Sequence, residues 1–177
     1  MEEKIKAFDY MLHLFFQWRN SHKELGDTKL GFMMAQRLLF LASAPKEDGG
    51  EDLLDIFDNF YAMPDGPVEA DIYNVLEEDR LPLFTNKNRK FELREGVEPY
   101  DPKRYNGELY NRVRHAVDDL RKKNEKLILL NPFEVCAITQ SWYAWNRAMD
   151  FAEFMGANSA RMMVDKIRDS YKVFDLE

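Results

Sequence analysis

The stretch that decides the fold is residues 60–68, Phe60-Tyr61-Ala62-Met63-Pro64-Asp65-Gly66-Pro67-Val68. Pro64 restricts the residue before it to extended backbone, and the Asp65 side chain can hydrogen-bond its own backbone. Gly66 supplies a flexible joint, and Pro67 suits the first position of a helix because its missing N–H has no intrahelical partner there. The apolar residues that follow have helical spacing: Val68, Ile72, Tyr73 and Leu76. The stretch therefore predicts a turn that leads directly into a helix packed on a core.

Other segments carry helical patterns on either side of this turn. Apolar spacing predicts helices over residues 2–20, 29–44 and 108–124. Asn131-Pro132-Phe133-Glu134 has the composition of a capping box, so a further helix is expected from there to about Met155, where Gly156 ends it. A last helix is expected after Asn158 or Ser159, and its apolar residues are Met162, Met163, Ile167 and Tyr171.

Only short pieces of the chain suggest strands. Residues 53–60 are expected to form a short helix followed by an extended piece. Residues 83–85 and 91–93 flank a polar segment and predict a small hairpin. The predicted fold is therefore mostly α, a single compact helical domain over residues 1–177 with about six helices and at most a small β-hairpin.

Composition places the chain among folded proteins. Of its 177 residues, 45% are hydrophobic and 32% are charged, which suffices for a buried core without a metal or disulfide. Cys136 has no second cysteine to pair with, and the sequence shows neither a signal region nor a long apolar run. We therefore expect a cytoplasmic protein.

Charge is unevenly distributed along the chain. Residues 46–79 carry twelve acids and one lysine, whereas residues 80–126 carry thirteen bases and eight acids. An acidic surface disfavours nucleic-acid backbones and can attract a basic partner. The alternative is that these charges solvate loops and outer helix faces.

Residue types that carry chemistry do not form a recognisable catalytic set. His13, His22 and His115 show no zinc-like spacing with each other or with Cys136, and no phosphate-binding glycine loop is present. Cys136 and His13 fall among apolar residues, as core residues do. We therefore assign no catalytic residue, no metal and no cofactor.

Two tryptophans are candidates for a binding surface. Trp142 and Trp145 lie three residues apart in the predicted helix and so share a helix face. That face either anchors a partner or fills the domain's own core.

The chain resembles the Panacea domain, the family that includes the SocA-like antitoxins. The resemblance rests on the Gly66-Pro67-Val68 turn, on Thr28-Lys29-Leu30, and on Gln36-Arg37-Leu38-Leu39-Phe40-Leu41-Ala42, which is similar to that family's Gln-Lys-Leu-Leu-Tyr-Phe-Ala helix. A weaker similarity lies at Thr139-Gln140-Ser141-Trp142, where Gln140 occupies a position at which the family often has histidine. Residues 31–35 also place Thr28-Lys29-Leu30 farther from the Gln36–Ala42 segment than is usual in the family. The best match covers about residues 5–80, and helices over 132–173 complete the bundle.

The resemblance implies a function. It implies an antitoxin-like, phage-associated protein of a toxin–antitoxin system that binds and neutralises a cognate toxin by direct contact, or that delivers the toxin to a protease. No enzymatic activity and no direct contact with nucleic acid or membrane is expected. The expected partner-binding or family-motif residues are Lys29, Gln36, Tyr61, Asp65, Gly66, Pro67, Trp142 and Trp145.

Two other functions remain open at this point. One is a small hydrolase-type enzyme that uses carboxylates and a histidine brought together by folding. The other is a phage or mobile-element accessory protein that self-associates.

Overall fold

The fold is mainly helical and carries two small sheets. The computed structural model describes residues 1–26, 29–46, 50–98, 101 and 103–170. The α-helices in these residues are α1 (Glu2–Asn20), α2 (Phe32–Ser43), α3 (Ala70–Glu77), α4 (Glu108–Lys123), α5 (Pro132–Thr139), α6 (Tyr143–Phe154) and α7 (Val164–Arg168). The strands are β1 (Phe60–Met63), β2 (Gly66–Glu69), β3 (Phe84–Lys87), β4 (Lys90–Leu93) and β5 (Ala160–Arg161), and the 3-10 helices are η1 (Lys23–Leu25) and η2 (Glu125–Leu129).

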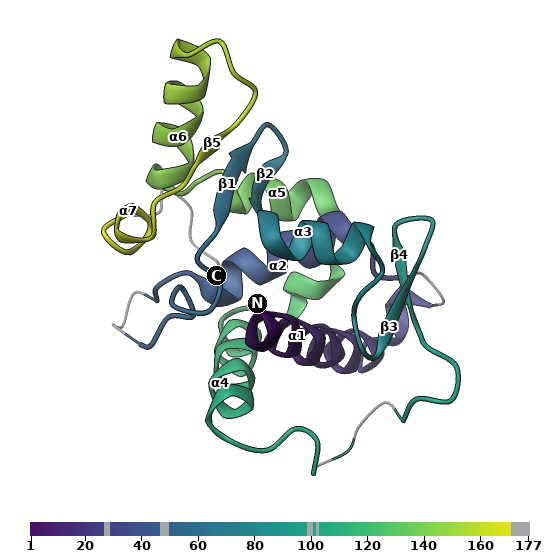
Figure 1. Ribbon diagram of the computed structural model, residues 1–177. Helices are drawn as coiled ribbons and strands as arrows, with labels where there is room; N and C mark the ends of the chain where they lie inside the picture. Colours follow the sequence, from purple (N-terminus) through teal and green to yellow (C-terminus); the bar gives the residue numbers. More distant parts are fainter. Residues whose placement is uncertain (27–28, 47–49, 99–100, 102, 171–177) are drawn as a thin grey trace.

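The predicted fold class is wrong in its β content. Instead of at most one small hairpin, the described residues form a three-stranded antiparallel sheet in the order β2-β1-β5 and a separate β3-β4 hairpin. Seven α-helices replace the six that were expected. Figure 1 shows the helices α1 and α2 near the centre, with the two sheets on different sides of the molecule.

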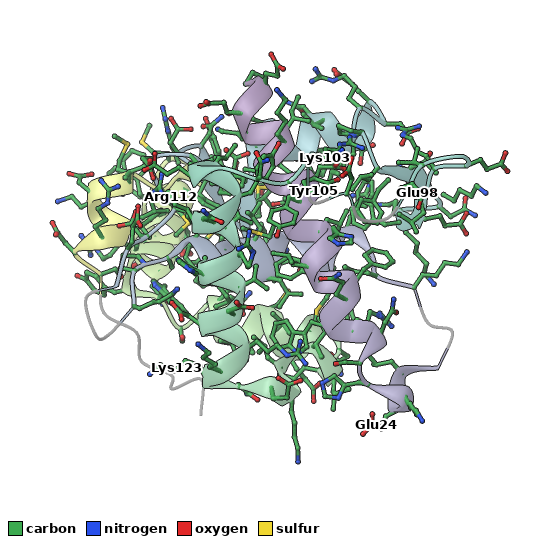
Figure 2. All side chains as sticks on the ribbon, turned by 90° about the horizontal axis from the view of Figure 1, so that it is seen from below. Glu24, Glu98, Lys103, Tyr105, Arg112 and Lys123 are labelled. Carbon is green, nitrogen blue, oxygen red and sulfur yellow. The ribbon has the colours of Figure 1, made fainter. Side chains whose placement is uncertain are left out.

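Helices α1 and α2 form the middle of the core. Helix α1, predicted over residues 2–20, buries Phe8, Leu12 and Phe15 completely, and each such burial contributes roughly 2 kcal/mol. Helix α2 is buried on nearly all sides, as expected of a helix that is apolar around its whole circumference. It begins at Phe32, three residues later than predicted. Figure 2 shows α1 and α4 side by side.

The deciding stretch forms a hairpin and does not lead directly into a helix. Strand β1 pairs antiparallel with β2, so that Ala62 faces Pro67 and Met63 faces Gly66. The prediction that Pro67 begins a helix is therefore wrong. Proline is compatible with β2 because this strand lies at the edge of the sheet. Helix α3 begins later, and the Glu69 side chain caps it by accepting the Ile72 N–H at 2.7 Å.

The predicted helix from Asn131 to Met155 is divided in two. Its capping box is confirmed: Asn131 and Glu134 exchange side chain to backbone hydrogen bonds of 3.0 and 2.8 Å. The helix nevertheless ends at Thr139. The Ile138 carbonyl accepts both the N–H and the hydroxyl of Ser141, which competes with continued helical bonding.

The last predicted helix is also shorter than expected. Gly156 follows α6 with φ +67°, as expected of a helix-ending glycine. The chain then forms β5, whose residues pair with β1, and α7 begins only at Val164. Tyr171 and the rest of the expected helix to residue 173 lie outside the described residues.

Two local predictions are confirmed. The β3-β4 hairpin forms where residues 83–85 and 91–93 predict it, with Asn88 and Arg89 at its turn. Both have φ near +55°, as a tight two-residue hairpin turn requires. Helix α4 forms over the predicted 108–124 segment.

Candidate functional site

The tip of the β1-β2 hairpin is held by side chains from α2, from α6 and from the residue that follows α5. Trp145 of α6 donates its Nε1–H to the Met63 carbonyl at 3.1 Å, and Gln140 donates its amide to the Pro64 carbonyl at 2.8 Å. Arg37 of α2 donates to the next carbonyls along the chain. The hairpin thus joins helices that lie far apart in the sequence.

Arg37 is the centre of this arrangement. Its guanidinium donates to the carbonyls of Asp65 and Pro67 at 2.7 Å each, and its Nε lies 3.2 Å from the Cys136 sulfur. The residue is only 3% exposed. Hydrogen bonds from a charged donor contribute about 1.5–3 kcal/mol each, so Arg37 fixes the hairpin to α2.

Gly66 is required by this close approach. Its φ is +109°, a value that side chains with a Cβ rarely adopt. A Cβ there would also lie 2.8 Å from Arg37 Nε and 2.9 Å from the Thr139 hydroxyl. The glycine identified from the sequence is therefore a structural requirement of the hairpin.

Gln36 acts on the same hairpin from α2. Its carbonyl oxygen accepts the Glu69 N–H at 3.0 Å, and its amide donates to the Glu69 carbonyl at 3.4 Å. This pair of bonds continues the edge of β2 as a further strand would.

The remaining predicted residues are dispersed. Tyr61 lies in β1 opposite Arg161 of β5. Trp142 is 3% exposed and meets Phe40 edge to face in the core, so it does not share a surface with Trp145. The break between α5 and α6 separates the two tryptophans.

Lys29 lies away from the hairpin tip. It forms an ion pair with Glu92 of β4, on the other hairpin. The structure thus brings together Gln36, Asp65, Gly66, Pro67 and Trp145, and it does not bring Lys29 and Trp142 to the same place.

A second polar cluster surrounds Lys4 of α1. Its ammonium lies 2.7 Å from Asp58, 2.7 Å from Glu69 and 2.6 Å from Asp71. Oxygens of these carboxylates lie within 4.8 Å of one another, as in a cation site. Here the cation is the lysine itself, which ties the N-terminal helix to the sheet and to α3.

Burial and ion pairing act against each other in this cluster. The Lys4 pKa is raised well above its usual range, because hydrogen bonds to the carboxylates outweigh the effect of burial. Burial raises the pKa of Glu69, and the bond from Lys4 only partly offsets it. Burial also acts to raise the pKa of Asp71, but its bonds from Lys4 and Asn59 lower it overall.

Several acids of residues 46–79 form ion pairs with cations from other parts of the chain. Besides the Lys4 cluster, Arg112 pairs with Glu51 and Asp55, and Arg168 pairs with Asp52. The strong charge separation along the chain therefore becomes a set of ion pairs between segments that fold together.

The cysteine belongs to the Arg37 arrangement, whereas His13 lies apart from both clusters. The His13 ring of α1 lies nearly parallel to the rings of Tyr10 and Tyr105. Burial lowers the His13 pKa, which favours the neutral ring at physiological pH. Cys136 is 6% exposed and donates its S–H to the Asp65 carbonyl at 2.8 Å.

Helix α6 has an unusual distribution of side chains. It buries Ala144 and Ala152, while it exposes larger apolar side chains. We call these the α6 face, together with the neighbouring residue that follows β5: Tyr143 (43% exposed), Phe151 (59%), Phe154 (85%), Met155 (61%) and Met163 (53%). At 100° per residue, the members in and next to α6 occupy about one third of the helix circumference.

The α6 face borders a groove of about 600 Å³ between α6, β5 and α7. Three basic side chains from these elements line it, namely Arg147, Arg161 and Lys166, together with one acid, Asp169. Within the described part of the chain, none of the three basic groups has an ion-pair partner. Figure 1 shows α6, β5 and α7 projecting from one end of the molecule, next to β1.

The hairpin motif and the α6 face are physically connected. Trp145 fastens α6 to the tip of the hairpin, and Met162 donates its N–H to the Phe60 carbonyl at 2.8 Å. The β1-β2 hairpin therefore supports the helix that carries the α6 face.

Sequence reasoning missed Arg37, Lys4 and the α6 face. Arg37 stands inside the apolar run of α2, and a charge at such a position indicates a buried polar partner. The α6 face had a weaker signal, because Phe151, Phe154 and Met155 follow the same spacing as core residues.

The comparisons with known proteins add no family. No protein-family model matches the chain, and neither a curated protein nor a solved structure matches it. The Panacea resemblance therefore stays a prediction. Among the described residues, no helix combines the length and apolar character that crossing a membrane requires.

Proposed function

We propose that this protein binds another protein through the α6 face, and that the bound protein is a cognate toxin which it neutralises by direct contact. The observation that carries the proposal is the inverted burial of α6. The fully buried residues of α6 are alanines, whereas Phe151, Phe154 and the adjacent Met155 are each more than half exposed. Apolar side chains gathered in this way are typical of protein interaction sites.

The placement of this surface also supports a binding role. Helix α6 is fastened to the hairpin through Trp145, so its exposed side chains are presented on a supported element. A supported surface loses less conformational entropy on association. Blocking a toxin in this way requires no catalytic group in the present chain.

The proposed antitoxin role rests on the sequence resemblance to the Panacea family. A second form of this role is that the chain binds the toxin and delivers it to a protease. Both versions require a stable complex. They differ in the fate of the toxin, which is lost over time when it is delivered and persists when it is only covered.

Growth of a bacterial host tests the proposal. Each protein encoded beside the gene for this chain is expressed alone and then together with the chain. We expect one of them to arrest growth alone and to become harmless when the wild-type chain is present. The double substitution F151S/F154S should abolish this protection.

A matched control separates the surface from general effects of mutation. Phe133 of α5 is 73% exposed and lies outside the α6 face, so F133S should protect as the wild type does. Thermal unfolding of the purified variants checks that their folds are intact. Protection by F151S/F154S equal to that of the wild type would exclude the α6 face, and the absence of any toxic neighbour would count against the antitoxin role.

A further inference from the structure

A separate groove lies on the other side of the β1-β2 hairpin, between its tip, the start of α2 and the turn of the β3-β4 hairpin. Its volume is about 430 Å³. The apolar lining includes Phe32, Met33, Val68 and Tyr73. No residue of the α6 face lines this groove.

Arg37 lines this groove and carries a buried charge without a counterion. It is 3% exposed, and no carboxylate of the described residues pairs with it. Asp65 contributes its backbone carbonyl to Arg37, while its side chain is exposed and forms no ion pair there. The guanidinium is thus surrounded by neutral acceptors.

The hydrogen bonds of Arg37 use only part of its capacity. A guanidinium has five N–H groups. The Nε–H is directed to the Asp65 carbonyl and the Cys136 sulfur, and one N–H of Nη1 is directed to the Pro67 carbonyl. The described residues supply no hydrogen-bond acceptor for Nη2.

Other groups at the groove favour an anion with an apolar part. Lys90 lies at the rim, exposed and without an ion-pair partner among the described residues. Arg89 lies over the rings of Phe32 and Tyr73 and is paired with Glu77. The cations therefore exceed the acids around an apolar lining.

We propose that this groove is a binding site for a carboxylate carried on an apolar group, with Arg37 as the residue that binds the carboxylate. A planar carboxylate matches the fork of the guanidinium and supplies the missing counterion. The ring or aliphatic part of the ligand contacts Phe32 and Tyr73. The same chemistry is available from a free carboxylic acid or from the carboxylate of a partner protein.

Benzoate is the probe that tests the site, and benzyl alcohol is its neutral counterpart of similar shape. The full chain is titrated with each while the Arg37 Nε–H and the backbone amides are followed by NMR. We expect benzoate to shift the Arg37 signal and the amides of Gly31, Phe32 and Met33 with saturation in the millimolar range. Benzyl alcohol should give less than one tenth of these shifts.

Two substitutions sharpen the result. R37K keeps the charge and removes the fork, and we expect it to weaken benzoate binding at least tenfold. K90Q removes a charge from the rim and should weaken binding about threefold, whereas K126Q removes an exposed charge on η2, outside the groove lining, and should leave it unchanged. Because R37K can disturb the hairpin, the comparison of benzoate with benzyl alcohol on the wild type carries the test if that variant unfolds.

The outcomes are distinct. Equal shifts from benzoate and benzyl alcohol, or benzoate shifts spread over surface lysines in place of the groove, would overturn the proposal. Competition between benzoate and a toxin identified by the growth test would indicate that the carboxylate belongs to the partner protein. Benzoate binding without such competition would indicate a free carboxylic acid, and neither result depends on the α6 face.

Discussion

Gly66 shows how one residue can decide a local fold. Two separate conditions exclude a side chain at this position, namely its φ of +109° and the approach of Arg37 Nε to 2.8 Å from a Cβ placed there. The first condition concerns the backbone alone, and the second concerns packing between the hairpin and α2. A substitution therefore affects both the turn and its anchor.

We predict that G66A lowers the free energy of unfolding by about 3 kcal/mol, as the sum of backbone strain and overpacking. Gly96 is the matched control, because its φ is also positive, at +71°, but a Cβ there would meet nothing within 4 Å. G96A should cost only about 1 kcal/mol. Urea unfolding of both variants measures the difference, and equal costs would contradict the close approach of Arg37.

Asp9 is a buried acid whose ionisation opposes folding. Burial raises its pKa from 3.8 to about 6, although the Leu83 N–H and the charges of Arg104 and Arg94 act in the other direction. The folded protein therefore holds this proton over a range in which the unfolded chain has lost it. Stability from this group is fully present below about pH 4 and is lost as the pH rises through 6.

We predict that D9N removes this contribution. The difference in unfolding free energy between D9N and wild type should move by about 2.4 kcal/mol in favour of D9N between pH 4 and pH 7. Urea unfolding at several pH values measures it. Taking the difference cancels the titration of groups outside the site, and a difference independent of pH would show that Asp9 has an ordinary pKa.

At the scale of elements, the hairpin and α6 are coupled by few contacts. The fully buried residues of helix α6 are the small Ala144 and Ala152, so its position depends strongly on the partly buried Trp145 and on the pairing of β5 with β1. Elements with little buried apolar area open locally at low free-energy cost.

We predict that W145F, which keeps an aromatic ring and removes the bond to the Met63 carbonyl, lowers the opening free energy of α6 by about 1 kcal/mol. Amide hydrogen exchange in α6 should then be about fivefold faster. W18F is the control, because Trp18 makes a similar 3.0 Å bond to the Glu125 carbonyl, between α1 and η2. Faster exchange in α6 from W18F, or none from W145F, would contradict the assigned coupling.

Elements with local signals were predictable from the sequence. The capping box at Asn131 and the small hairpin formed by residues 83–85 and 91–93 depend on neighbouring residues only, and both are confirmed. The end of α5 at Thr139 was not predictable in this way. Residues 140–142 carry no glycine or proline, and Trp142 leaves the helix because the core offers it a place against Phe40.

The prediction for residues 60–68, a helix start at Pro67 instead of a hairpin, was wrong for a related reason. A glycine and a proline in sequence fit both a hairpin and a helix start, and the choice depends on Arg37, which is some thirty residues away. Of the candidate site, the sequence located the hairpin tip correctly but not its anchoring role. It also could not separate an exposed apolar face from a buried one, because both have the same spacing.

At the scale of the whole molecule, charge and apolar surface are distributed differently. The acidic segment is paired with Lys4, Arg112 and Arg168, so it links the N-terminal helix, α4 and α7 to the middle of the chain. Among the described residues, five of the nine large exposed apolar side chains belong to the α6 face, and the other four are Met1, Tyr73, Leu93 and Phe133. Helix α6 and β5 lie at one end of the molecule (Figure 1). The α6 face therefore holds more of these exposed apolar side chains than any other described element, which supports the proposal that it contacts another protein.

The most direct test of this conclusion is calorimetric titration of the chain with the toxin that the growth experiment identifies. We predict a one-to-one complex whose dissociation constant rises at least a hundredfold in F151S/F154S, about 3 kcal/mol for two exposed aromatic anchors, and stays unchanged in F133S. The two variants should unfold at the same temperature as the wild type. Equal affinity of wild type and F151S/F154S would show that the toxin binds elsewhere and would contradict the account.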